Sequence, residues 1–424
     1  MVQLIDRFKT VPYPANLIQL DHGLTLIHQY QPATPVAVVD VWVKAGTIVE
    51  PDNWSGMAHF LEHMIFKGSK RVLPGIFDQM IENSGGMANA ATSYDYAHFF
   101  LTTAAEYLPD TLPYLAEILL HAEIPDEEFV RERDVVLEEI RSCYDDPDWL
   151  AFQSLCESLY QRHPYGRSIL GHESQLLQHS PHQMRCFHRT HYQPDKMTVV
   201  VVGNLQEEVV LKLVNQEFGE FSAPSECPPI QTLAEPPLLE VRRTQMYLPR
   251  LEQARLLMGW IGPGVDCLED GFGLDLISAI LGVGRSSRLV QQLREQKHLV
   301  LDVESSFSLQ RDSSLFTIAA WLDPQDLEIV EQLILDNLME LQVKPVTEEE
   351  LERGKRLLCH DYIFSTETPG QLAGLYGYYQ TIASAEVSLS YPRIIEQFSA
   401  KDLQRIADQY LSPERYAITV MQPC

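Results

Sequence analysis

The sequence predicts an α+β protein of two homologous halves, each a mostly antiparallel sheet with helices packed on it. A chain of 424 residues is too long for one ordinary hydrophobic core, so we expect two domains. A proline-rich stretch divides the chain near its middle, and similar segments recur about 220 residues apart. Apolar residues make up 45% of the chain and charged residues 21%, as in ordinary globular proteins.

The proline-rich stretch, FGEFSAPSECPPIQTLAEPPLLEV, covers residues 218–241. It holds five prolines and little apolar periodicity, which is typical of a linker. We therefore expect an N-terminal α+β domain over residues 1–220, a linker over 221–240 and a C-terminal α+β domain over 241–424.

Two pairs of segments indicate an internal duplication. PVAVVDVWVKAG (35–46) leads into a helical segment, and QARLLMGWIGPG (253–264) leads into the helical pattern GFGLDLISAILG. Near the ends of the halves, HYQPDKMTVVVVG (191–203) resembles QYLSPERYAITVM (409–421). Both pairs have nearly the same offset, which is the signature of a repeated unit.

The β-rich runs predict how the strands pair. LTLIHQY, VAVVDVWVKAG and AHFFLTTA follow one another without a crossover of about ten residues between every pair. Such a run favours an antiparallel sheet covered by helices, hence the α+β class.

Charge and cysteine usage exclude several classes of function. The net charge of −27 argues against nucleic acid as a partner; it fits a solvated acidic surface better than a preference for basic ligands. Seven dispersed cysteines without a Cys-x-x-Cys pair indicate free thiols in a reducing compartment. The first residues lack the pattern of a signal peptide, and no apolar run reaches about 18 residues, so we expect a cytoplasmic protein without a membrane span.

The segment HFLEH carries the candidate chemistry. His59, Glu62 and His63 are spaced i, i+3 and i+4, so on a helix all three project from one face. Ser55 is the expected N-cap of that helix and Gly68 its C-terminal stop. Two histidines one turn apart can bind one zinc ion, while a neighbouring glutamate holds a water; the pattern occurs in inverzincins. A pair of solvent-facing histidines with a flanking carboxylate is an equally good interpretation at this point.

A third metal ligand is expected in PDEEFVRERDVVLEEIRS (125–142). Its apolar stripe predicts a helix with these residues buried: Phe129, Val136, Leu137 and Ile140. Glu138 lies opposite the stripe and should be solvated. Glu132 and Glu139 flank the stripe on the same edge, where each is either a partner of a metal site or a surface carboxylate.

HFLEH, followed by the Glu139 of ERDVVLEEI, resembles the pitrilysin family of zinc peptidases, and within it the mitochondrial-processing-peptidase-like members. Three further stretches resemble family segments in the expected order: GGMANAATSYDYAHF, HPYGRSILG and HYQPDKMTVVVVGNL. The duplication and the linker also match, so the resemblance covers nearly the whole chain.

The resemblance implies a zinc-dependent endopeptidase with one zinc ion per chain. It implies His59, His63 and Glu139 as zinc ligands, Glu62 as the general base, and Glu132 as a carboxylate that positions the site. The expected substrates are peptides or unfolded segments. The alternative is a non-catalytic scaffold or peptide-binding subunit of a processing-peptidase-like complex, in which the zinc site should be eroded.

The resemblance also implies an edge strand near Asn89 and Ala90, to which an extended peptide adds as a further strand. An ordinary strand and turn is the competing interpretation of GGMANAATS.

One family feature is broken in the second half. Members carry an arginine and a tyrosine seven positions apart that hold substrate; here Arg294 is present, but Leu301 replaces the tyrosine and His298 a common glycine. A surface charge is the preferred interpretation of Arg294. Family members of this size enclose a chamber with two chains, so we expect a dimer. It is either a heterodimer with a zinc-free homologous subunit that supplies the missing pair, or a homodimer.

Overall fold

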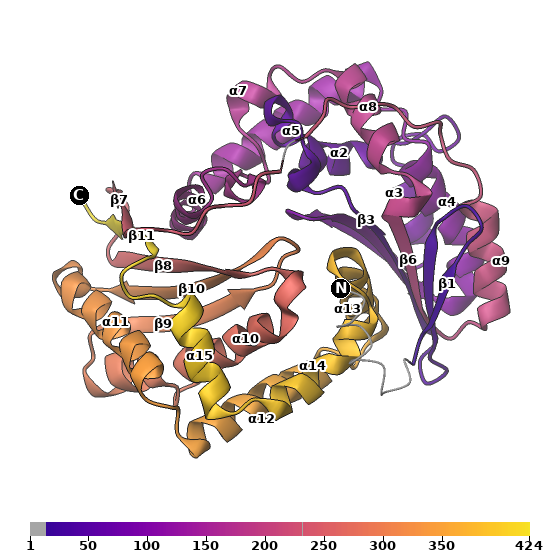
Figure 1. The fold of residues 1–424 in the computed structure, drawn as a ribbon. Helices are drawn as coiled ribbons and strands as arrows, with labels where there is room; N and C mark the ends of the chain where they lie inside the picture. The colour runs from indigo at the N-terminus through magenta and orange to yellow at the C-terminus, as the bar shows by residue number, and fades with distance from the viewer. Residues whose placement is uncertain (1–13, 231) are drawn as a thin grey trace.

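The structure is a computed structural model that describes residues 14–230 and 232–424. Figure 1 shows two sheets in separate parts of the molecule, each with helices packed against it. Among the described residues, no helix combines the length and the apolar character needed to cross a membrane.

The first sheet has six strands in the order β1-β2-β6-β3-β5-β4. Its strands are β1 Asn16–Gln19, β2 Thr25–Tyr30, β3 Val36–Val43, β4 Met87–Thr92, β5 Ala97–Ala104 and β6 Met197–Gly203. Only β2 and β6 pair in parallel; every other neighbouring pair is antiparallel.

The second sheet has five strands in the order β7-β11-β8-β10-β9. Its strands are β7 Arg242–Tyr247, β8 Ala254–Pro263, β9 Val300–Ser308, β10 Ser313–Leu322 and β11 Ala417–Gln422. Here too one pair, β7 with β11, is parallel and the rest are antiparallel. Once β1 is set aside, the other five strands of the first sheet have the same order and relative directions as the five strands of the second sheet. The expected fold class of two homologous, mostly antiparallel halves is therefore confirmed.

The helices follow the same repeat. Before the linker they are α2 Met57–Ile65, α3 Ile76–Asn83, α4 Leu108–Leu120, α5 Asp126–Cys143, α6 Pro147–Leu159, α7 Glu173–Leu176, α8 Pro181–His191 and α9 Glu207–Glu217. After it they are α10 Leu268–Gly282, α11 Leu327–Val343, α12 Glu348–Phe364, α13 Pro369–Ile382, α14 Glu386–Gln397 and α15 Ala400–Tyr410. A π-helical segment, Val290–Gln296, follows α10.

The two halves exchange one helix each. Alternate residues of β3 point to opposite faces of the sheet. Val39 and Val41 join the core beneath α2 and α5, whereas Trp42 faces α13, which comes from the other half. In return, α6 packs on β8 and β11 of the second sheet (Figure 1), where Leu155 is fully buried. The boundary that we propose at residues 221–240 therefore separates the two sheets but not all of their helices.

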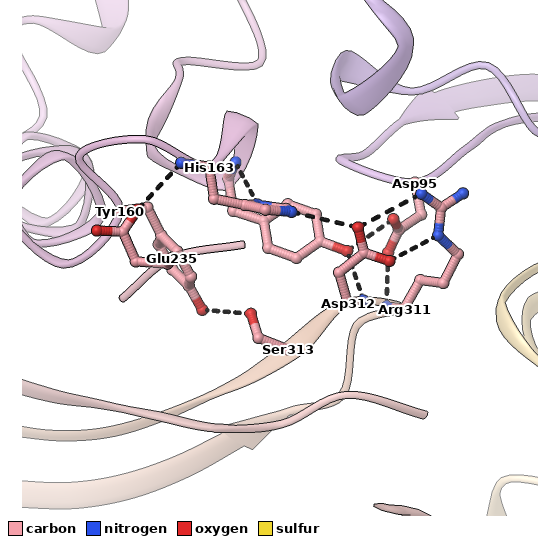
Figure 2. Close-up of polar contacts among 8 residues, drawn as sticks. Asp95, Tyr160, His163, Glu235, Arg311, Asp312 and Ser313 are labelled. Atoms are coloured by element: carbon pink, nitrogen blue, oxygen red, sulfur yellow. Dashed lines mark hydrogen bonds and ion pairs between the residues drawn. The ribbon is translucent and has the colours of Figure 1, made fainter. Parts of the chain in front are cut away.

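Polar contacts also join the halves, as Figure 2 shows. Asp95, in the turn between β4 and β5, accepts hydrogen bonds from the Tyr165 hydroxyl at 2.8 Å and the Arg311 amide at 3.0 Å. His163 Nε2 lies 3.2 Å from Asp312 Oδ2. That contact lowers the pKa of Asp312, and burial raises the pKa of Asp95. The segment HPYGRSILG thus helps to fix the β9–β10 hairpin of the second half against the first.

Candidate metal centre

The N-terminus of α2 differs from the sequence prediction. The N-cap is Gly56, with φ +83°, and not Ser55. The first amides of the helix are bound by the buried carboxylate of Glu50, which accepts hydrogen bonds from Gly56 N at 3.1 Å and Ala58 N at 2.7 Å. Burial raises the pKa of Glu50 to about 8. A serine hydroxyl is therefore unnecessary at this cap, because a carboxylate from the preceding loop satisfies the free amides.

The rest of α2 packs as its apolar residues predict. Phe60 is fully buried, and its ring lies 4.6 Å from that of Phe129 on α5. This contact sets the two helices side by side. The chain leaves α2 after Ile65, and Gly68, with φ +90°, marks the turn away from it.

Three side chains meet between α2 and α5. His59 Nε2 lies 3.6 Å and His63 Nε2 lies 3.4 Å from Glu139 Oε2. One ligand atom from each residue can be chosen so that all three lie within 4.8 Å of one another. Within the described parts of the chain, this is the only group of three or more His, Cys, Asp or Glu side chains with metal-binding spacing.

The three residues fit a zinc ion. Ligands about 2.0–2.1 Å from zinc at tetrahedral angles lie roughly 3.3–3.4 Å from one another. The two His–Glu distances, 3.4 and 3.6 Å, need little adjustment to reach that value. Two histidines and one carboxylate leave a fourth position open, as in catalytic rather than structural zinc sites.

Glu132 holds one of the histidines in place. Its Oε1 lies 2.9 Å from His63 Nδ1, and its Oε2 lies 2.7 Å from Lys67 Nζ. Burial alone would raise the pKa of Glu132, but the hydrogen bonds with His63 and Lys67 lower it. A carboxylate that binds Nδ1 orients the ring so that Nε2 faces Glu139. The two carboxylates on the same edge of α5 therefore contact His63 at different ring nitrogens, Glu132 at Nδ1 and Glu139 at Nε2.

The surroundings of the two histidines shift their pKa values in opposite directions. Burial lowers the pKa of His59 to about 4, so its ring is neutral. Burial acts in the same direction on His63, but its contacts with Glu132 and Glu139 raise its pKa to about 9. Glu138, one position before Glu139, is exposed and paired with Arg141, which confirms the prediction that it is solvated.

Glu62 is fixed by a residue that the sequence analysis did not single out. The Thr92 hydroxyl donates a 2.6 Å hydrogen bond to Glu62 Oε2, and burial raises the pKa of Glu62. Thr92 is the last residue of β4 and lies within GGMANAATS. Its place at the end of a strand of small residues was the available signal, but only the fold brings it to α2.

The edge strand expected near Asn89 and Ala90 is present. β4 lies at the end of the sheet and pairs with β5 alone among the described strands. Asn89 is exposed, whereas Ala90 is half-buried and packs toward the core. The free backbone edge of β4 therefore ends beside Glu62, because Thr92 belongs to the same strand.

Arg294 lies in the second half, outside the group of three ligands. Its guanidinium pairs with Asp302 at 2.8 Å and with Glu295 at 3.2 Å, so the interpretation as a surface charge accounts for its contacts. Leu301 is 56% exposed on β9. His298 has φ +52°, a left-handed conformation that favours glycine, which explains why glycine suits this position.

Two family models match the chain. Residues 25–173 match the model described as Insulinase (Peptidase family M16), and residues 180–358 match the Peptidase M16 inactive domain. His59, His63 and Glu139 all lie in the first of these segments.

Individual proteins are similar over nearly the full chain. Uncharacterized zinc protease YmxG of Bacillus subtilis is 28% identical over 404 residues, 95% of this chain and 97% of that protein. Zinc protease PqqE of Helicobacter pylori is 28% identical over 410 residues, 96% and 92% of the two chains. The crystal structure of a protease from Helicobacter pylori has a TM-score of 0.90 at 27% identity and covers 96% of this chain and 99% of that one.

Proposed function

Because this chain belongs to the pitrilysin family of peptidases, family M16, we propose that it is a zinc-dependent endopeptidase that hydrolyses peptides or unfolded segments. The observation that carries the proposal is the group His59, His63 and Glu139, whose ligand atoms lie within 4.8 Å of one another, with Glu62 on the same helix as the two histidines. One zinc ion per chain would be held by these three residues.

Each residue of the site has a distinct role in this proposal. A zinc ion held by these residues would lower the pKa of a water molecule and polarise the substrate carbonyl. Glu62 takes a proton from the attacking water and passes it to the leaving amine. Thr92 holds one oxygen of Glu62, so the carboxylate keeps its direction. Glu132 orients the ring of His63.

The substrate binds as an extended strand along β4. The exposed edge of β4 offers the backbone groups of alternate residues in the stretch that holds Asn89 and Ala90, and such recognition depends on the peptide backbone more than on its side chains. Bound there, a peptide is directed toward Glu62, since Thr92 is on the same strand. Within a single chain, Arg294, which the family resemblance places among the substrate-holding residues, pairs with Glu295 and Asp302.

We further propose that two chains enclose the site. The partner is either a zinc-free homologous subunit that supplies an arginine and tyrosine pair, or a second copy of this chain in which Leu301 is tolerated. The size of the pure protein in solution, combined with its peptidase activity, separates the two arrangements. A fully active homodimer would exclude the need for a different partner.

A non-catalytic scaffold or peptide-binding subunit is the alternative function. It predicts the loss of ligands or of the general base, whereas His59, Glu62, His63 and Glu139 are all present. The metal group therefore favours the enzyme.

The test is cleavage of a quenched fluorescent peptide library by the zinc-loaded protein and by Glu62→Gln. Glu62→Gln should keep its zinc and lose about 10²- to 10⁴-fold in turnover, because the amide cannot accept the proton. A Glu62→Gln protein as active as the wild type would overturn the assigned role. A wild type that holds one zinc per chain and cleaves nothing would point to the missing tyrosine and to a partner subunit that carries it.

A further inference from the structure

Two cysteines that are far apart in sequence meet where the linker contacts α8. Cys186 lies on α8 and Cys227 in the extended segment after α9, 41 positions later. Their sulfur atoms are 3.5 Å apart. Both side chains are half-buried, so a small reagent can reach them. Among the described residues, no other two cysteine sulfurs form such a contact.

The two sulfurs are held in place by their neighbours. Thr190 Oγ1 donates a 2.7 Å hydrogen bond to Ser225 O, which fastens the linker backbone to α8. The Cys227 thiol lies 3.3 Å from the same hydroxyl, and the Cys186 thiol lies 3.5 Å from Glu226 O. The contact between the thiols therefore belongs to a segment whose backbone is hydrogen-bonded to α8 at Ser225 and Glu226, directly before Cys227.

We propose that Cys186 and Cys227 are a site of reversible oxidation to a disulfide, with a small-molecule disulfide as the oxidant. Cys186, as the thiolate, attacks one sulfur of the reagent, forms a mixed disulfide and releases one small thiol. Cys227, as the thiolate, then attacks the Cys186 sulfur and releases the second thiol. Two protein thiols are oxidised, one reagent disulfide is reduced to two thiols, and the protein protons pass to the released thiolates.

The order of attack follows from the surroundings of the two thiols. Burial raises the pKa of Cys227 to about 11, which keeps this thiol protonated and slow to attack. Once Cys186 carries the mixed disulfide, Cys227 is already adjacent, so its reaction is intramolecular.

The disulfide would tie the start of the linker covalently to α8. It would also close a chain loop through β6 and α9, and such a loop restricts the unfolded chain and stabilises the folded one. Neither cysteine belongs to the metal group, so this inference stands apart from the proposed peptidase activity.

The test uses the full chain incubated with excess oxidised glutathione at mildly alkaline pH, followed by alkylation of free thiols, digestion and mass spectrometry. We expect one cross-linked peptide pair joining Cys186 to Cys227, about 2 Da lighter than the two free thiols and cleaved by dithiothreitol. The other cysteines should be recovered alkylated. Recovery of both residues as free thiols, or each with its own glutathione and no cross-link, would overturn the proposal.

Variants define the roles of the two thiols. Cys227→Ser should stop the reaction at the mixed disulfide on Cys186, whereas Cys359→Ser, a half-buried control elsewhere, should leave the cross-link unchanged. Oxidation should raise the melting temperature of the wild type by about 5 °C and that of Cys227→Ser not at all. An equal rise in both proteins would contradict the cross-link as the cause.

Discussion

The helix that follows β3 and the helix that follows β8 occupy equivalent places in the two halves, yet their contacts differ in kind. On α2, His63 meets the buried carboxylate of Glu132 from α5. On α10, Leu276 and Ile280 face Gly354 of α12 so closely that a Cβ on this glycine would lie 2.9 and 3.0 Å from them. The α2–α5 pair thus combines the apolar contact of Phe60 with Phe129 and a polar network around Glu132, whereas close apolar packing joins α10 to α12 at Gly354.

This difference shows what the fold must supply to hold a polar site. A buried charge is costly unless a partner compensates it. In the first half, Glu132 is compensated by both His63 and Lys67, while Glu62 is compensated by Thr92. The second half has no such group of metal-binding side chains among its described residues, and the buried carboxylate of α10, Asp270, is compensated by Arg405 and Tyr410.

The contact between the halves gives the largest expected effect on stability. Leu155 of α6 is fully buried against the second sheet, so Leu155→Ala should lower the free energy of unfolding by about 2–5 kcal/mol. Denaturant unfolding measures this loss. Phe152→Ala, on the exposed side of the same helix, should have a much smaller effect. A loss below about 1 kcal/mol for Leu155→Ala would show that the exchanged helix is not needed by the second sheet.

The carboxylate network gives the next effect. Glu132→Gln should weaken zinc binding by about 10- to 100-fold, because the amide orients His63 less firmly. Competition with a chelating dye measures the zinc affinity. Glu138→Gln, on the exposed face of the same helix, is the matched control and should bind zinc like the wild type. Equal zinc affinities for the wild type, Glu132→Gln and Glu138→Gln would show that Glu132 does not support zinc binding.

The apolar contact of the second half gives the smallest effect. Gly354→Ala places a methyl group against Leu276 and Ile280, and the overpacking should outweigh the gain in helix propensity, for a net loss of about 1 kcal/mol. Gly374→Ala in α13 is the control, since its Cβ would meet nothing within 4 Å, and it should be neutral or stabilising. If both variants gain stability equally, α10 and α12 have room for an added methyl group at Gly354, which would contradict the close contact.

Local patterns in the sequence predicted the elements well. The run AHFFLTTA coincides with β5, Ala97–Ala104, because alternation along a strand is a local property. The helical wheel of residues 125–142 placed Glu138 in solvent and left Glu132 and Glu139 on the edge that faces α2. His59 and His63 lie one helical turn apart, so their common face could be predicted from the spacing alone.

Contacts between distant segments could not be predicted in the same way. The cap from Glu50, the hydrogen bond from Thr92 and the pairing of Cys186 with Cys227 depend on how loops and strands pack in three dimensions. The exchange of α6 and α13 has the same origin, because the sequence of a helix does not say which sheet it will cover.

The zinc content of the purified chain tests the central claim most directly. After saturation with zinc and removal of the excess, elemental analysis should find one zinc per chain in the wild type and almost none in a His59→Ala, His63→Ala double variant, with both proteins folded by circular dichroism. A wild type without zinc, or a double variant that keeps the metal, would contradict a zinc site built between α2 and α5.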